Sequence, residues 1–185
     1  MSTNNAVNTS LSGQSGTGSF AGTTSPTFVT PTMGAASATS VTFSSTTGIV
    51  GTTTNNNAAA GSVGELISSV IPIASAISLS NGTAANVTTI SLTAGDWDIS
   101  GNVFFAGTGV FTAIDCWTSL VSAPTVPDAS LLTGAASSAL GNSGFVTPFL
   151  RVSIATTTTV YLGATANIST GSVTACGGIF ARRVR

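Results

Sequence analysis

The chain has 185 residues, of which 42% are hydrophobic and only 5% are charged. It contains no histidine and no lysine, and its five acidic residues and four arginines give a formal net charge of −1. Binding to nucleic acid or to an anionic membrane depends on a basic surface, so we expect neither. A monomeric soluble domain would carry several times more charge, which indicates a surface of uncharged polar groups shared in part with other copies.

The beginning of the chain has neither the basic region nor the apolar region of a secretory signal. No later run approaches the roughly 20 apolar residues of a membrane-spanning segment. We therefore expect the protein to be made and folded in a cytoplasm, with Cys116 and Cys176 as buried free thiols. Neither cysteine has the neighbouring Cys or His ligands of a zinc site, and no cofactor or metal is expected.

Residues 1–60 are predicted to form an extended, low-complexity N-terminal arm. The segment is rich in Ser, Thr, Gly and Asn and has too little apolar surface to fold by itself. Its few apolar residues are spaced as in docking segments, which become ordered when they place side chains in successive pockets of a partner. The residues expected to attach the arm to another protein are Phe20, Phe28 and Val29, and those expected to contact neighbouring subunits are Val41 and Phe43.

Residues 61–185 are predicted to form one all-β domain. The apolar residues from Val63 to Ile73 favour a strand or a single turn that Pro72 ends, and Ala74–Leu79 favours a further short strand before the Asn81-Gly82 turn. The clearest pattern follows in Asn86–Gly107, where two alternating stretches flank Gly95. This pattern predicts two strands joined by a hairpin or a tight corner.

In the second of these strands, Trp97, Ile99, Val103 and Phe105 share the face that is predicted to be buried. A strand is also expected in Phe111–Val121, followed by a long polar loop from Ser122 to about Ser143. The bulky residues of this loop are Leu131, Leu132 and Leu140. The loop has no aromatic residue for stacking on a glycan.

Three more strands complete the domain. The first two show alternation, and the third ends the chain. They are centred on Leu150–Ile154, on Val160–Ala166 and on Thr174–Val184. About eight strands without a convincing helix are typical of a β-sandwich or a barrel. Among these we favour a jelly-roll-like β-sandwich with an extended N-terminal arm.

An enzymatic function is not expected. Asp96 and Asp98 could suggest the carboxylate pair of a glycosidase, but alternation places both on the face opposite Trp97, where solvated turn chemistry is the ordinary explanation. The chain has no His or Lys for acid-base or nucleophilic work and no serine in a nucleophile elbow. Calcium binding by Asp96, Asp98 and Asp115 would need a ligand loop that the sequence does not show.

Two segments resemble a known family. Gly16–Gly48, which contains GTGSF followed by SPTFVTP, resembles a module of phage and prophage tail-fibre proteins. Val63–Phe105, with LTAGDWDISGNVFF at its end, resembles the C-terminal domain that follows this module. The resemblance covers about half of the chain and implies a homotrimeric fibre that ends in a compact β-rich tip.

The resemblance predicts a structural protein of a bacteriophage virion. In long fibres an anchoring domain and a shaft precede the module, whereas here the module begins at Gly16. We therefore expect a separate distal tip, or a short fibre or spike that other virion proteins hold by its N-terminal arm. Its β tip is expected to contact a bacterial surface receptor, chiefly through the long loop, whose receptor-facing residues would be Leu131, Leu132 and Leu140. The alternative is a head fibre or capsid decoration protein that its arm binds to the shell.

Overall fold

The computed structural model of the protein describes residues 40, 53–125, 128 and 131–185, without the side chains of 137–140. The chain divides into two units, Met1–Thr52 and Thr53–Arg185, and only Ser40 of the first unit is described. The predicted contacts of Phe20, Phe28, Val29, Val41 and Phe43 therefore lie outside the described residues.

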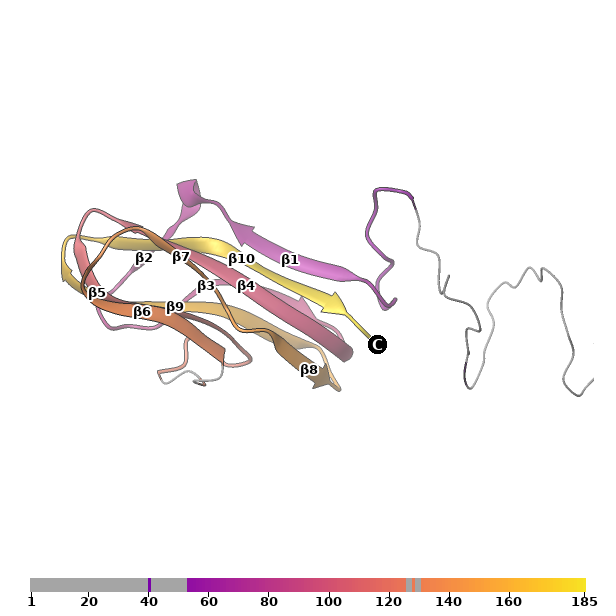
Figure 1. The fold of residues 1–185 in the computed structure, drawn as a ribbon. Coiled ribbons are helices and arrows are strands. Elements are labelled where there is room, and N and C mark those ends of the chain that lie inside the picture. Colours follow the sequence, from indigo (N-terminus) through magenta and orange to yellow (C-terminus); the bar gives the residue numbers. More distant parts are fainter. Residues whose placement is uncertain (1–39, 41–52, 126–127, 129–130) are drawn as a thin grey trace, which may run out of the picture. The chain divides into compact units, whose positions relative to one another are not determined.

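The second unit consists of β-strands and one short 3-10 helix (Figure 1). Along the chain these elements are β1 (Leu66–Ile71), η2 (Ile73–Ser75), β2 (Ile77–Leu79), β3 (Ala85–Leu92), β4 (Gly95–Gly107), β5 (Val110–Ser119), β6 (Leu132–Leu140), β7 (Ser143–Val146), β8 (Leu150–Ile154), β9 (Thr158–Thr170) and β10 (Val173–Arg183). No described helix is long and apolar enough to cross a membrane.

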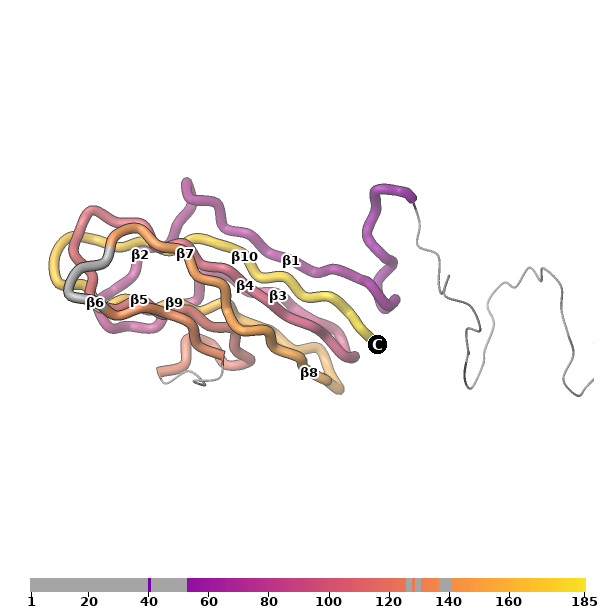
Figure 2. The backbone as a smooth tube through the Cα atoms, viewed as in Figure 1, coloured from indigo at the N-terminus to yellow at the C-terminus, as the bar shows by residue number. Residues whose placement is uncertain are grey.

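The strands form two antiparallel sheets that pack face to face, as the tube in Figure 2 shows. One sheet, called sheet A, has the order β1-β10-β4-β7, with β2 also paired to β10 and β8 also paired to β4. The other, sheet B, has the order β3-β9-β5-β6. β1 and β2 both pair with β10 and count as one position, and β7 and β8 both pair with β4 and count as another. When the eight resulting positions are numbered along the chain, their order is 1-8-3-6 in sheet A and 2-7-4-5 in sheet B. This is the jelly-roll topology, and it confirms the predicted jelly-roll-like β-sandwich.

About eight strands were predicted, whereas the described residues form ten, and the two missed strands are β6 and β7. Ser122–Ser143 was expected to be a loop, and this is wrong for Leu132–Leu140, which form β6. The strand β7 begins where the predicted loop ends. The β6 sequence LTGAASSAL has small side chains without regular alternation. As an edge strand, β6 is held by backbone pairing to β5 on one side, so it does not need a row of large buried residues.

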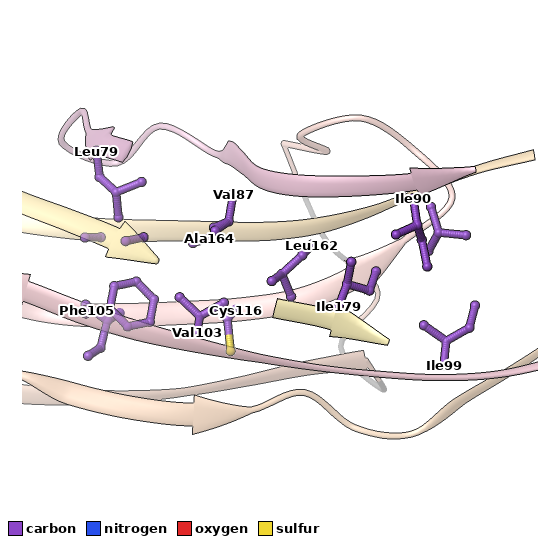
Figure 3. Packing of buried hydrophobic residues seen from close by; sticks show 14 of the residues in the cluster. Leu79, Val87, Ile90, Ile99, Val103, Phe105, Cys116, Leu162, Ala164 and Ile179 are labelled. Atoms are coloured by element: carbon purple, nitrogen blue, oxygen red, sulfur yellow. The ribbon is translucent and has the colours of Figure 1, made fainter. Parts of the chain in front are cut away.

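The inner faces of the two sheets form one apolar core (Figure 3). Trp97, Ile99, Val103 and Phe105 are fully buried from β4, as the alternation predicted. The other fully buried members of this core are Leu92, Phe111, Ile114, Cys116, Val160, Leu162, Ala164, Ala166, Ala175, Ile179 and Ala181. Cys116 and Cys176 are both buried free thiols, in agreement with the prediction.

A tight corner joins the two sheets between β3 and β4. β3 pairs with β9 in sheet B and β4 pairs with β10 in sheet A, so the connection is a corner and not a hairpin. Gly95 begins β4 with a φ of 141°, which side chains rarely allow. The indole Nε1 of Trp97 donates to the carbonyl oxygen of Thr93 at 2.9 Å, so the buried ring also fixes the corner.

Replacing Trp97 with alanine should strongly destabilise the domain. Removal of a buried aromatic side chain costs about 3–5 kcal/mol, and here the hydrogen bond to Thr93 is lost as well. Chemical denaturation of the variant would measure the loss. Phe149→Ala is the matched control, because Phe149 is 63% exposed and its removal should change stability by less than about 0.5 kcal/mol. A similar loss in both variants would contradict the described burial.

Candidate functional site

Seven of the nine charged residues gather at one end of the sandwich, where β1 and β4 begin and β10 ends (Figure 1). We call this the charged end; its residues are Glu65, Asp96, Asp98, Arg151, Arg182, Arg183 and Arg185. The chain also enters the domain here, through residues 53–65. The two remaining charged residues are Asp115 in β5 and Asp128 in the β5–β6 connection.

Arg183 is the buried centre of the charged end. Its Nε donates to Glu65 Oε2 at 2.9 Å, its Nη1 to the carbonyl oxygen of Ala94 at 2.8 Å, and its Nη2 to Thr93 Oγ1 at 2.5 Å. The guanidinium carbon lies 4.3 Å from the centre of the Trp97 ring. One side chain therefore joins the start of β1, the β3–β4 corner and the end of β10.

A cluster of arginines at the end of a chain is ordinarily expected to be solvated, and for Arg183 this expectation is wrong. Arg183 is only 5% exposed. It lies on the same face of β10 as Ile179 and Ala181, so the alternation of the strand turns it inward. Arg182 and Arg185 are exposed, as expected.

Glu65 and Asp96 are held as carboxylates at this end. The backbone N–H of Gly61 donates to Glu65 at 2.8 Å, and this bond, together with Arg183, lowers the pKa of Glu65. A hydrogen bond from Ser153 and the charges of Arg185 and Arg151 lower the pKa of Asp96 despite its burial. Asp96 was expected on the solvent side of a turn, but it is 5% exposed and pairs with Arg185 at 2.8 Å.

The predicted receptor-facing leucines do not share one loop. Leu131 and Leu132 are half-buried where the β5–β6 connection meets β6, and Leu132 pairs with Trp117 of β5. Leu140 ends β6 at the opposite end of the strand, where its backbone pairs with Phe111. The strand β6 separates these leucines. This strand was not predicted because its sequence lacks regular alternation.

The β5–β6 connection is fastened to β3 by Asn86. The Asn86 amide donates to Ser122 Oγ at 2.7 Å and accepts from the Ala123 N–H at 2.9 Å. Ala123 has a φ of 37°, an unusual value for a residue other than glycine. These bonds hold the start of the β5–β6 connection against the beginning of β3.

The described residues form no pocket and no group of three potential metal ligands. Asp115 lies in sheet B, apart from Asp96 and Asp98 in sheet A. Burial raises the pKa of Asp115, and burial with the nearby Asp115 charge raises that of the Cys116 thiol to about 12. What the surface offers instead is exposed apolar side chains on the outer side of sheet A: Leu66, Val70, Val146, Phe149 and Phe180.

No known family model and no curated protein matches the chain. Among solved structures, it is similar to the VP2 subviral particle of infectious bursal disease virus, with 16% identity, a TM-score of 0.41, and coverage of 64% of this chain and 33% of that one. It is also similar to the Gx strain of the same virus, with 15% identity, a TM-score of 0.40, and coverage of 74% and 36%. The T13 particle of this virus gives 14% identity, a TM-score of 0.39, and coverage of 64% and 31%.

The chain thus spans about a third of the length of these viral proteins. TM-scores this low carry no argument about function.

The pairing at the charged end predicts that the domain loses stability in acid. Glu65 and Asp96 have lowered pKa values in the folded state, so their contribution is present above their unfolded-state pKa and is lost as the pH falls through the folded-state values. The melting temperature should therefore fall between about pH 6 and about pH 2.

The test compares the parent with Glu65→Gln/Asp96→Asn, both in an Asp115→Asn background. That background is needed because the raised pKa of Asp115 acts in the opposite direction. The double variant should melt lower at neutral pH and change less with pH, by differential scanning calorimetry. Equal slopes for parent and variant would contradict the prediction.

Proposed function

We propose that the protein is a structural subunit of a bacteriophage virion, a tail fibre or spike whose trimeric β tip contacts the host surface. The observation that carries this proposal is the polarity of the sandwich. Residues 53–65 lead into β1 at the charged end, and none of the described residues at the opposite end is charged. An arm held by another virion protein would leave that opposite end exposed to the surroundings.

The opposite end is built from short turns that hydrogen bonds tie to the sheets. Asn81 Oδ1 accepts from the Ile168 N–H at 2.7 Å, Asn142 Oδ1 accepts from the Gly107 N–H at 3.0 Å, and the Thr108 N–H donates to the Ser172 carbonyl oxygen at 3.3 Å. These bonds make a compact, neutral contact surface. We place host contact at this end, where β6 ends with Leu140, whereas Leu131 and Leu132 lie at the start of β6.

The sequence supports the phage assignment through its two family-like segments. Gly16–Gly48 resembles the tail-fibre module, and Val63–Phe105 resembles the domain that follows it. The second segment runs through β1, β2, β3 and most of β4, including the β3–β4 corner. The resemblance thus includes the part of the domain on which the core and the charged end both depend.

A head fibre or capsid decoration protein is the second candidate. The jelly-roll topology favours it, because this fold recurs in viral capsid domains. In this case the same arm would bind the shell. Immunolabelling of intact particles in negative stain separates the two: label at the tail supports the fibre or spike, and label over the head supports the decoration protein.

Deleting residues 2–35 should prevent incorporation into particles without unfolding the protein. The deletion removes Phe20, Phe28 and Val29, which we expect to dock on another virion protein, and leaves the whole sandwich intact. Quantitative immunoblotting of purified particles from a complemented deletion phage would measure the copy number. Normal copy number in the variant would place the attachment site in the β domain and reverse the proposed polarity.

The purified full-length protein should be a homotrimer. The near absence of charge indicates that part of the neutral surface is shared, and the family resemblance implies three copies. Sedimentation equilibrium at micromolar concentrations gives the mass directly, for comparison with the 18.1 kDa of one chain. A monomer under these conditions would contradict the fibre model.

A further inference from the structure

One edge of sheet A is only partly closed. β1 pairs with β10 on one side, and on its other side the Asn57 carboxamide donates to the Leu66 carbonyl oxygen at 2.8 Å and accepts from the Leu66 N–H at 2.9 Å. Alternate residues of a strand direct their backbone groups to the same side. Ser68 and Val70 therefore present theirs to this free edge, where the described residues provide no backbone partner for them.

The chain itself does not continue along this edge. A strand running antiparallel from Asn57, opposite Leu66, would bring residues 53–55 beside Ser68 and Val70. Residues 53–56 belong to no strand and are exposed, and the Asn56 N–H bonds locally to the Thr54 carbonyl oxygen at 2.9 Å. Asn57 thus closes the edge at Leu66 and leaves the rest of β1 open.

The surface beside Val70 at the open edge is apolar. Phe180 lies next to Val70 over Gly178, since a methyl group on Gly178 would approach both side chains to 3.0 Å. Val70 is 58% exposed and Phe180 37% exposed. An exposed backbone edge beside exposed apolar side chains is the kind of site that accepts an added strand.

We infer that the open edge of β1 accepts residues 41–50 of a neighbouring copy as an added strand. This segment, VTFSSTTGIV, contains no charge and begins with the alternation Val41-Thr42-Phe43. The residues from 41 to 52 span roughly 40 Å when extended, about twice the length of β1, so the segment is long enough to pair along the whole open edge of another copy. The inference rests on the self-association proposed above. It identifies the open edge of β1 as the part of the neighbouring subunit that Val41 and Phe43 contact.

The first test is a proline at Ser68 in the full-length protein. The Ser68 N–H faces away from β10, so proline removes no bond of the sheet but denies one to an added strand. Ser68→Ala keeps the N–H and is the matched control. In sedimentation equilibrium we expect Ser68→Ala to assemble like the parent and Ser68→Pro to dissociate at a concentration about tenfold higher or more. Unchanged assembly of Ser68→Pro would overturn the inference.

The second test stays informative if the proline variant fails to fold. Two differently tagged full-length chains are co-expressed, one with Ser68→Cys and the other with Thr42→Cys, Ser44→Cys or Ser45→Cys. Mild oxidation should give a disulfide product that carries both tags in at least one combination. The buried Cys116 and Cys176 stay in place, and the chain without added cysteines controls for them.

The outcomes separate this inference from the proposed trimer. A monomeric parent would overturn both. A trimeric parent without any two-tag product would overturn the strand addition and leave the trimer standing. A third variant carries Ser68→Cys and one of the arm cysteines in the same chain. If its disulfide forms only within that chain, the segment binds its own domain and the assignment to a neighbouring copy is wrong.

Discussion

The domain depends on the contact between the Arg183 guanidinium and the Trp97 ring. Trp97 is fully buried and anchors the start of β4, while Arg183 covers the ring and satisfies its own donors with Glu65, Ala94 and Thr93. A cation is costly to bury unless it is paired and hydrogen-bonded, and here it is both. Gly95 has no side chain where this guanidinium passes, because a Cβ at Gly95 would overlap Arg183 Nη1. The β3–β4 corner, the Trp97 ring and the Arg183–Glu65 ion pair are therefore in direct contact, and a change in one would disturb the other two.

Much of this arrangement could be predicted from alternation along single strands. The pattern in β4 identified Trp97, Ile99, Val103 and Phe105 as the buried face, and the same reasoning identified β8 and β9. It also contained the signal for Arg183, which follows Ile179 and Ala181 at a spacing of two. That signal was missed because charge at a chain end is usually solvated. The partner Glu65 is 118 residues away along the chain, and no local pattern links the two.

The remaining errors in the predicted strands come from segments whose side chains do not distinguish a strand from a loop. β6 has only small residues between its terminal leucines, so neither periodicity nor hydrophobicity distinguishes it from a loop. Its position follows from the backbone of β5, which needs a partner on its far side. Pairing of this kind is a property of the assembled sheet. For the same reason, the partly open edge of β1 became visible only when Asn57 was seen opposite Leu66.

The charged end has a consequence for copies packed side by side. It brings together three carboxylates and four guanidinium groups, and most of them are already paired within one chain. Copies arranged in parallel around an axis place these ends next to one another, where a single sign of charge would produce repulsion that grows with every added copy. Because the opposite charges nearly cancel inside each subunit, parallel packing accumulates almost no electrostatic cost, whatever the number of copies.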